Sequence, residues 1–122
     1  STTNDMTGGL QKIKWSWTCD SAGAYSEAST VRPNGMIYRL VTIPTDGPTD
    51  AYNVTILDAD GVDVLNSQGL NRATATTEQK GPSDGLGVVK SSLLTLTIAN
   101  AGDAKSGTVI LYVLDLDKGV LG

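Results

Sequence analysis

Residues 52–65 constrain the fold most, because polar and apolar side chains alternate there with a period of two. The alternating positions are Tyr52, Asn53, Val54, Thr55 and Ile56. This period predicts a strand with one buried face and one solvated face. A second apolar run, 62–65, follows a break at 58–61, where aspartates accept local backbone hydrogen bonds and a glycine tolerates a positive φ. Residues 52–65 therefore predict a β-hairpin.

Other parts of the chain repeat this strand signal. Residues 12–19 alternate, with Ile13, Trp15, Trp17 and Cys19 sharing one face. Residues 36–43, 93–99 and 108–115 also predict strands, and 24–31 predict a weaker one. Residues 108–115 are apolar on both faces, which is typical of a central or covered strand.

The length of 122 residues fits one domain with a sizeable core. The 14 glycines and the absence of phenylalanine and histidine favour short strands joined by turns. We therefore expect an all-β fold, a single-domain antiparallel β-sandwich (jelly-roll-like) or small barrel with about seven strands. We expect a flexible N-terminal arm over 1–9, the β-sandwich domain over 10–117 and a C-terminal tail over 118–122. Residues 66–87 predict a long, irregular loop.

The composition argues against several functions. Without histidine, the common nucleophilic triads and histidine-ligated metal sites are excluded. The single cysteine, Cys19, has no disulfide partner in the chain and is expected to be a buried thiol. A net charge of −4 with scattered cations disfavours nucleic acid, and no apolar run approaches the ~20 residues that span a bilayer. We expect no enzymatic activity, no cofactor, no small-molecule substrate and no membrane contact.

Two groups of residues remain as candidate sites. Asp58, Asp60 and Asp63 could supply hard oxygen ligands to a cation, but the spacing differs from that of a calcium loop, and a hairpin turn explains the same residues. Trp15 and Trp17 share one strand face, so they could fill the core, anchor an interface or form a sugar-stacking platform. Core filling is the preferred interpretation, and neither group is assigned as a catalytic, cofactor or metal site.

Several short motifs resemble those of small virion proteins encoded among the head genes of tailed bacteriophages. They are Lys14-Trp-Ser-Trp17, Gly35-Met-Ile-Tyr38, Ile43-Pro44, the block from Pro48 to Asp63, Asn71-Arg72, Leu96-Thr-Ile-Ala-Asn-Ala-Gly102 and Gly107-Thr-Val-Ile-Leu-Tyr112. Together they extend over about residues 13–112. The resemblance implies a structural virion protein, most plausibly a capsid decoration (cement) protein that binds and stabilises coat subunits. It carries no catalytic or ligand residue with it.

The same resemblance implies the partners and the location. The partners would be major capsid protein subunits and copies of this chain, and the location would be the capsid surface of the virion after synthesis in the host cytoplasm. Residues 1–9 and 118–122 would then become ordered on the capsid. Two alternatives remain open: a head-tail or tail accessory subunit, and a carbohydrate-binding β-sandwich module on the particle that uses Trp15 and Trp17 or the loop from Asn66.

Overall fold

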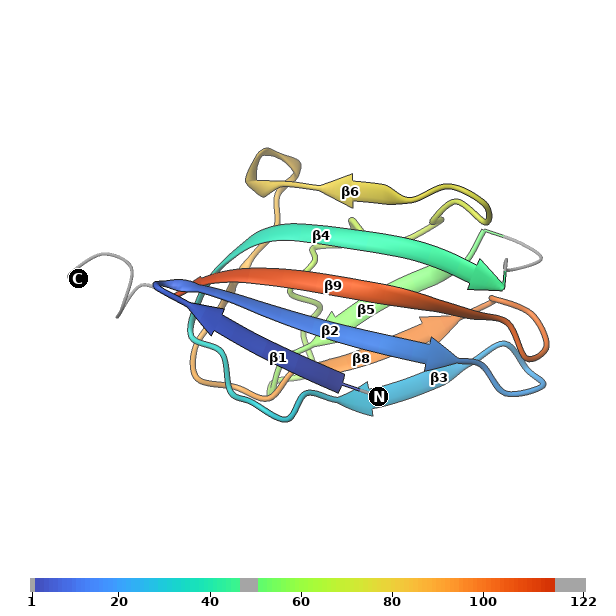
Figure 1. The fold of residues 1–122 in the computed structure, drawn as a ribbon, viewed down its shortest axis with the longest axis horizontal. Coiled ribbons are helices and arrows are strands. Elements are labelled where there is room, and N and C mark those ends of the chain that lie inside the picture. Colours follow the sequence, from blue (N-terminus) through green and yellow to red (C-terminus); the bar gives the residue numbers. More distant parts are fainter. Residues whose placement is uncertain (1, 47–50, 116–122) are drawn as a thin grey trace.

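The computed structural model describes residues 2–46 and 51–115, and these residues form an all-β sandwich (Figure 1). In chain order the elements are β1 (Thr2–Thr7), β2 (Leu10–Thr18), β3 (Tyr25–Ala28), β4 (Gly35–Asp46), β5 (Asn53–Leu57), β6 (Glu78–Lys80), the 3₁₀ turn η1 (Pro82–Asp84), β7 (Val88–Val89), β8 (Thr95–Ala99) and β9 (Ser106–Asp115). The predicted all-β antiparallel sandwich is confirmed. Because the strands divide into two separate sheets, the barrel alternative is wrong.

The two sheets differ in size. The six-stranded sheet has the order β1-β2-β9-β4-β6, with β7 also paired to β4, and the three-stranded sheet has the order β3-β8-β5. All of these pairings are antiparallel. In Figure 1 the larger sheet lies in front of the smaller one. β9 lies between β2 and β4, which confirms the central position predicted from its two apolar faces.

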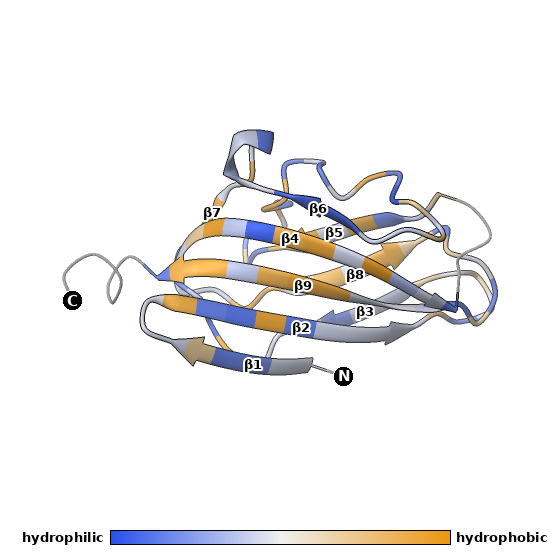
Figure 2. Cartoon of the chain, turned by 45° about the horizontal axis from the view of Figure 1, so that its top comes forward, coloured by the Kyte–Doolittle hydropathy of each residue, from blue (hydrophilic) through white to orange (hydrophobic). Residues whose placement is uncertain are grey.

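The core lies between the facing sides of the sheets. The larger sheet contributes residues such as Ile13, Trp15 and Leu111, and the smaller sheet contributes residues such as Ile56 and Ile98. Figure 2 shows the resulting alternation of hydrophilic and hydrophobic residues along β2. Burial of apolar area at roughly 25 cal/mol per Å² is the main favourable contribution to such a fold, so the alternating pattern explains why the sheets pack face to face.

The N-terminal segment corrects one prediction. Residues 2–7 form β1 at the edge of the larger sheet, so the expectation of a flexible arm is wrong for these residues. Thr7 pairs with Leu10 across Gly8 and Gly9, and the positive φ of Gly8 (61°) suits a two-residue hairpin. The hairpin supplies β1 with backbone partners along β2, which compensates for its single apolar side chain, Met6. Residues 118–122, the expected tail, lie outside the described residues.

The predicted central hairpin is only partly present. β5 and the turn at 58–61 form as expected, but residues 62–65 make a single bridge, Leu57 to Asp63, instead of a second strand. Beyond it, Val64 and Leu65 bend into the core. The segment still covers the edge of β5, because backbone bonds join Val64 N to Ile56 O (2.8 Å) and Val54 N to Gly69 O (2.8 Å). Local turns therefore replace the expected ladder.

Two other segments are more regular than predicted. β4 continues through Pro44 to Asp46, with register shifts between Ile37 and Arg39 and between Pro44 and Asp46. Pro44 lies opposite Gly107 on β9, but β6 pairs only with residues 40–42, so on that side of β4 no hydrogen bond is lost through the missing N–H of proline. The loop predicted over 66–87 contains β6 and η1. The nine strands of the described residues exceed the expected seven mainly through β1 and two very short strands, β6 and β7.

Candidate functional site

Both tryptophans belong to the core. Trp15 is 0% exposed and Trp17 is 1% exposed, and the Trp17 ring lies 5.5 Å from the ring of Tyr52, centroid to centroid. Core filling is therefore confirmed. The sugar-stacking platform and the interface anchor predicted as alternatives for these two residues are wrong, because a ligand or partner cannot reach a buried indole.

The three aspartates Asp58, Asp60 and Asp63 act as turn residues. Oδ1 of Asp58 accepts hydrogen bonds from the backbone N–H of Asp60 (2.9 Å) and Val62 (3.1 Å). The carboxylate of Asp63 likewise accepts backbone N–H bonds at the start of the next turn. These bonds confirm the turn interpretation. Within the parts of the chain that the structure describes, no group of three or more histidine, cysteine or acidic side chains could hold a metal ion.

Burial explains the raised pKa values of two core side chains, Cys19 and Tyr52. Burial raises the pKa of the Cys19 thiol, and Asp20 beside it adds to that shift, so the thiolate form is disfavoured. Cys19 is 5% exposed, which confirms the expected buried thiol. Burial also raises the pKa of Tyr52, partly offset by the neighbouring Thr42 hydroxyl. Neither shift activates a group for nucleophilic or acid–base chemistry.

The outer face of the six-stranded sheet has a more unusual composition. Residues directly opposite each other on paired strands point to the same side of a sheet, so the register defines rows across β2, β9, β4 and β7. The first row is apolar and consists of Leu10, Leu114, Met36 and Val88. Leu10 is 40% exposed and Val88 is 68% exposed. This row is an apolar strip in contact with solvent.

The second row carries positive charge around an aromatic ring. Lys12, Tyr112 and Arg39 lie opposite one another on β2, β9 and β4. The Nζ of Lys12 lies 6.0 Å from the centre of the Tyr112 ring, and the Cζ of Arg39 lies 5.4 Å from it. Cation–π attraction therefore holds both cations beside Tyr112. Arg39 Nε also donates to Oε1 of Gln79 at 2.9 Å, which fixes the guanidinium further.

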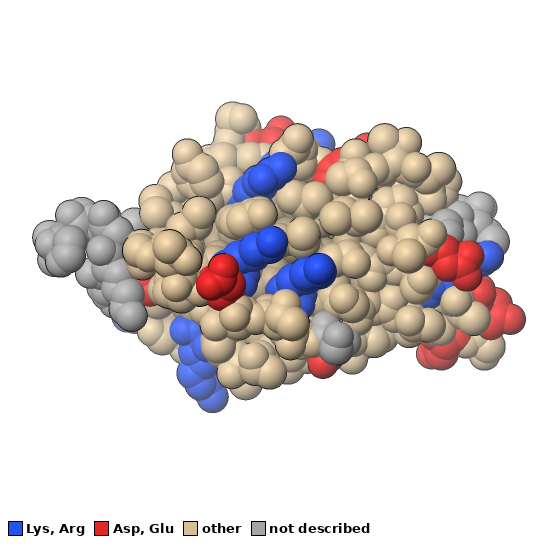
Figure 3. Space-filling view, viewed as in Figure 1, with Lys and Arg blue, Asp and Glu red and all other residues tan. Residues whose placement is uncertain are grey.

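The third row consists of Lys14, Ile110 and Val41. Lys14 is exposed, whereas Ile110 (9% exposed) and Val41 (6% exposed) are largely covered within the chain. We call the three rows together the platform; it consists of Leu10, Leu114, Met36, Val88, Lys12, Tyr112, Arg39, Lys14, Ile110 and Val41. Figure 3 views this face and shows Lys and Arg side chains gathered across the middle of the sheet with one acidic side chain beside them. The acidic residue of β1 in these rows is Asp5, which lies opposite Lys12.

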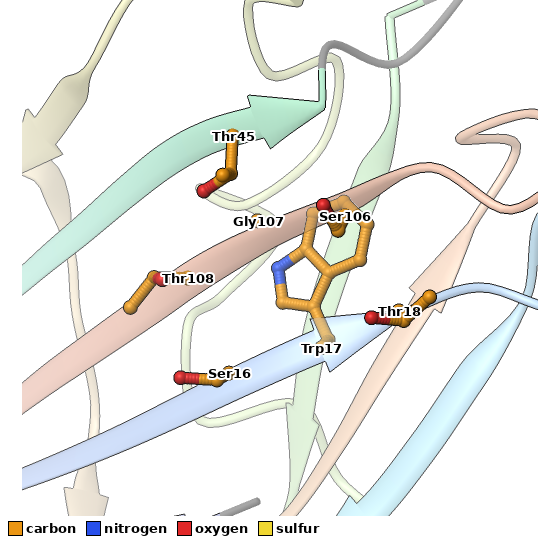
Figure 4. Close-up of a pocket in the computed structure, with 7 residues that line it drawn as sticks. All are labelled: Ser16, Trp17, Thr18, Thr45, Ser106, Gly107 and Thr108. Carbon is orange, nitrogen blue, oxygen red and sulfur yellow. The ribbon is translucent and has the colours of Figure 1, made fainter.

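Hydroxyl side chains predominate at the other end of the same face. A hollow of about 500 Å³ is lined there by Ser16, Trp17, Thr18, Thr45, Ser106, Gly107 and Thr108 (Figure 4). Gly107 is required in its position, because a Cβ would lie 2.6 Å from Cζ2 of Trp17 and 2.7 Å from the carbonyl oxygen of Ile43. The small side chains leave the lining of the hollow polar. The charges at this end are those of Asp46, which lies opposite Ser106, and Lys105, which forms an ion pair with Asp46 (3.8 Å).

The outer face of the three-stranded sheet carries no charge in its paired rows and has fewer apolar residues than the platform. Its middle row is Ser26, Thr97 and Thr55, and an adjacent row is Ala28, Thr95 and Leu57. Water can supply the hydrogen bonds that the hydroxyl groups of these side chains need. The platform is therefore the strongest candidate interaction surface among the described residues.

Sequence reasoning missed the platform. Its residues come from four strands that are distant in the sequence, so only the register of those strands reveals the rows. The available signal was the second apolar face of residues 108–115, which a sandwich core alone does not require.

No protein-family model matches the chain, and no curated protein matches it in sequence. In the described parts of the chain, no helix has the length and apolar character needed to cross a membrane.

Proposed function

We propose that this chain is a structural protein of a tailed-phage virion, which decorates the capsid by docking the platform onto coat subunits. The observation that carries the proposal is the exposed apolar and cationic outer face of the six-stranded sheet. The largest contiguous apolar patch on a soluble domain is often functional, and a polar rim around it is typical of an interaction site. The sequence motifs that resemble head-gene proteins supply the identity of the partner.

The platform has suitable dimensions for the centre of an interface. With strands about 4.8 Å apart and same-face residues about 6.8 Å apart, its Cα positions span about 14 Å in each direction. Side chains extend this area to a few hundred Å², a substantial part of the ~800 Å² that each partner buries in a standard interface. Aromatic and arginine residues such as Tyr112 and Arg39 are the types that most often dominate binding energy.

The rigid sandwich also suits a role in binding without a reaction. The platform lies on paired strands whose other faces are fixed by the core, so little conformational entropy is lost on docking. A decoration protein gains occupancy from repeated, symmetric contacts over the capsid, and many modest interfaces of this kind act together. We propose no enzymatic activity and no cofactor.

The alternatives predict different behaviour. A head-tail or tail accessory subunit would use the same platform at a few positions on the particle instead of over the whole shell. The carbohydrate-binding alternative loses the aromatic stacking surface that it was predicted to use, since Trp15 and Trp17 are buried. A glycan array should therefore give no Trp-dependent signal.

Co-sedimentation tests the proposal. Capsids assembled from the coat protein encoded in the same genome are mixed with purified chain and pelleted. We expect saturable binding with a fixed ratio of chain to coat subunits, and a capsid that withstands more heat when saturated. Absence of the chain from the pellet over the micromolar range, or binding at only one vertex, would contradict capsid decoration.

A further inference from the structure

The platform carries a charge opposite in sign to that of the whole chain. The net charge of the chain is −4, whereas the described residues of the platform rows present three cations, Lys12, Lys14 and Arg39, against the single carboxylate of Asp5. Among the described residues, none of these three cations forms an ion pair. Their charge is therefore available to a partner.

We propose that the platform binds an acidic segment of a partner protein, whose carboxylates meet Lys12, Lys14 and Arg39 while adjacent apolar side chains cover the row from Leu10 to Val88. This inference rests on the proposed docking function and adds the chemistry of the partner. Electrostatic complementarity of this kind speeds association and selects the orientation in which two surfaces meet.

Arg39 is prepared for such a carboxylate. The Nε of Arg39 already donates a hydrogen bond to Gln79, and the guanidinium group lies beside the Tyr112 ring. The terminal Nη groups can therefore bind an anion in a fixed direction. Arginine binds carboxylates through paired N–H donors, and a guanidinium held in advance loses less entropy when that bond forms. Lys12, on the other side of Tyr112, supplies a second positive charge two strands away.

The apolar row favours a protein over a nucleic acid as the partner of the platform. A nucleic acid would use the three cations through its phosphates but would leave Leu10 and Val88 uncovered, and specific binding to duplex DNA typically needs more phosphate contacts than three cations supply. A segment that mixes acidic and apolar residues satisfies both parts of the platform. A second copy of this chain is the other possible occupant, and it gives concentration-dependent self-association.

NMR titration of the full chain tests the chemistry without a capsid. The probes are a short peptide in which Glu alternates with Leu, the same peptide with Gln in place of Glu, and an oligothymidylate of similar length. We expect the Glu-Leu peptide to shift the amide signals of the three platform rows, the Gln-Leu peptide to bind at least about tenfold more weakly, and salt at about 0.5 M to weaken binding because it screens exposed charges.

Two double variants provide the matched comparison. K12E/R39E reverses two platform charges, and R32E/K90E makes the same change in net charge at exposed loop positions outside the three rows. We expect K12E/R39E to lose at least about tenfold in affinity for the peptide and for the capsid, and R32E/K90E to lose less than about twofold. If K12E/R39E does not fold, as judged by circular dichroism, K12Q/R39Q replaces it.

The outcomes separate the two proposals. If the original chain fails to bind capsids, the proposed function is wrong whatever the peptide does. If it binds capsids but K12E/R39E binds equally well, or if the oligothymidylate shifts the platform as strongly as the Glu-Leu peptide, the acidic partner is wrong. Shifts that depend on chain concentration without any probe would instead identify a second copy as the occupant and overturn the inference.

Discussion

The two sheets of the sandwich have similar inner faces and contrasting outer faces. On the middle strand of the larger sheet, Ile110 and Tyr112 alternate with buried core residues, so β9 has large side chains on both sides. On the middle strand of the smaller sheet, Thr95 and Thr97 occupy the outer positions. A core needs only one apolar face from each sheet. Ile110 is already covered within the chain, but Tyr112 and Leu114 on the same face of β9 remain partly exposed. The difference teaches that these two side chains are not required by the core, and docking is the explanation that we propose.

The largest loss of stability should come from truncating side chains on the inner faces, where the two sheets are alike. Ile13 and Ile98 lie on opposite sheets and are both fully buried. Truncating either to alanine should cost about 2–5 kcal/mol, because apolar contact is lost and a cavity remains. Urea unfolding followed by tryptophan fluorescence measures both. If I98A costs less than about 1 kcal/mol while I13A is severe, the smaller sheet does not share the core as described.

The next largest loss of stability is expected at the hydroxyl-rich end of the larger sheet. G107A should destabilise the fold by about 1–3 kcal/mol, since the added methyl group would overlap the Trp17 ring and the Ile43 carbonyl. Gly81 is the control, because a Cβ there meets nothing within 4 Å. Differential scanning calorimetry of G107A and G81A compares them. Equal melting temperatures would mean that Trp17 does not pack under Gly107 as the structure has it.

A reciprocal exchange on the outer faces sharpens the comparison directly. Ile110 is 9% exposed although it lies on the outer side of β9, so I110T should cost about 1–2 kcal/mol of apolar burial. Thr97 is only partly buried on the outer side of β8, and T97I should change stability by less than about 0.5 kcal/mol. Chemical unfolding of the two variants measures the difference. Equal changes in stability for I110T and T97I would contradict the difference in apolar burial between the outer faces of the two sheets.

The smallest effect is a pH dependence at the edge of the smaller sheet. Burial, with a hydrogen bond from the Tyr25 hydroxyl to Glu27, raises the pKa of Tyr25 from 10.0 to about 12. Because the folded state holds the phenolic proton more tightly, this contribution to stability is complete below pH 10 and is lost as the pH rises towards 12. The original chain should lose more stability than Y25F between pH 10 and 12, measured by urea unfolding. Parallel curves would contradict the interaction.

Alternation predicted the strands well because it is a local property of the sequence. Residues 12–19, 93–99 and 108–115 became β2, β8 and β9. The buried faces of β2 and β8 are those that the pattern indicates, whereas 108–115 are apolar on both faces and the pattern did not choose between them. β1 was missed because all its side chains except Met6 are polar and its order comes from backbone pairing across the Gly8-Gly9 turn. The second strand of the central hairpin, predicted over 62–65, did not form although its residues are apolar. Val64 and Leu65 reach the core through a bend in the chain and not through a paired strand.

The platform could not be predicted because it is a property of register. Lys12, Tyr112 and Arg39 are far apart in the sequence, and the shift in β4 between Ile37 and Arg39 decides which β4 side chain lies beside Tyr112. A slip of one residue would move every side chain of a strand to the opposite face. Pairing between distant strands is thus the information that the structure adds.

The most direct test is a cryo-electron microscopy reconstruction of capsids saturated with this chain. The central claim is that the outer face of the six-stranded sheet, and not that of the three-stranded sheet, meets the partner. We predict density for the sandwich over the coat lattice with Tyr112 and Arg39 at the contact. A sandwich bound through Thr55 and Thr97, or a bare lattice at saturating concentration, would contradict the account.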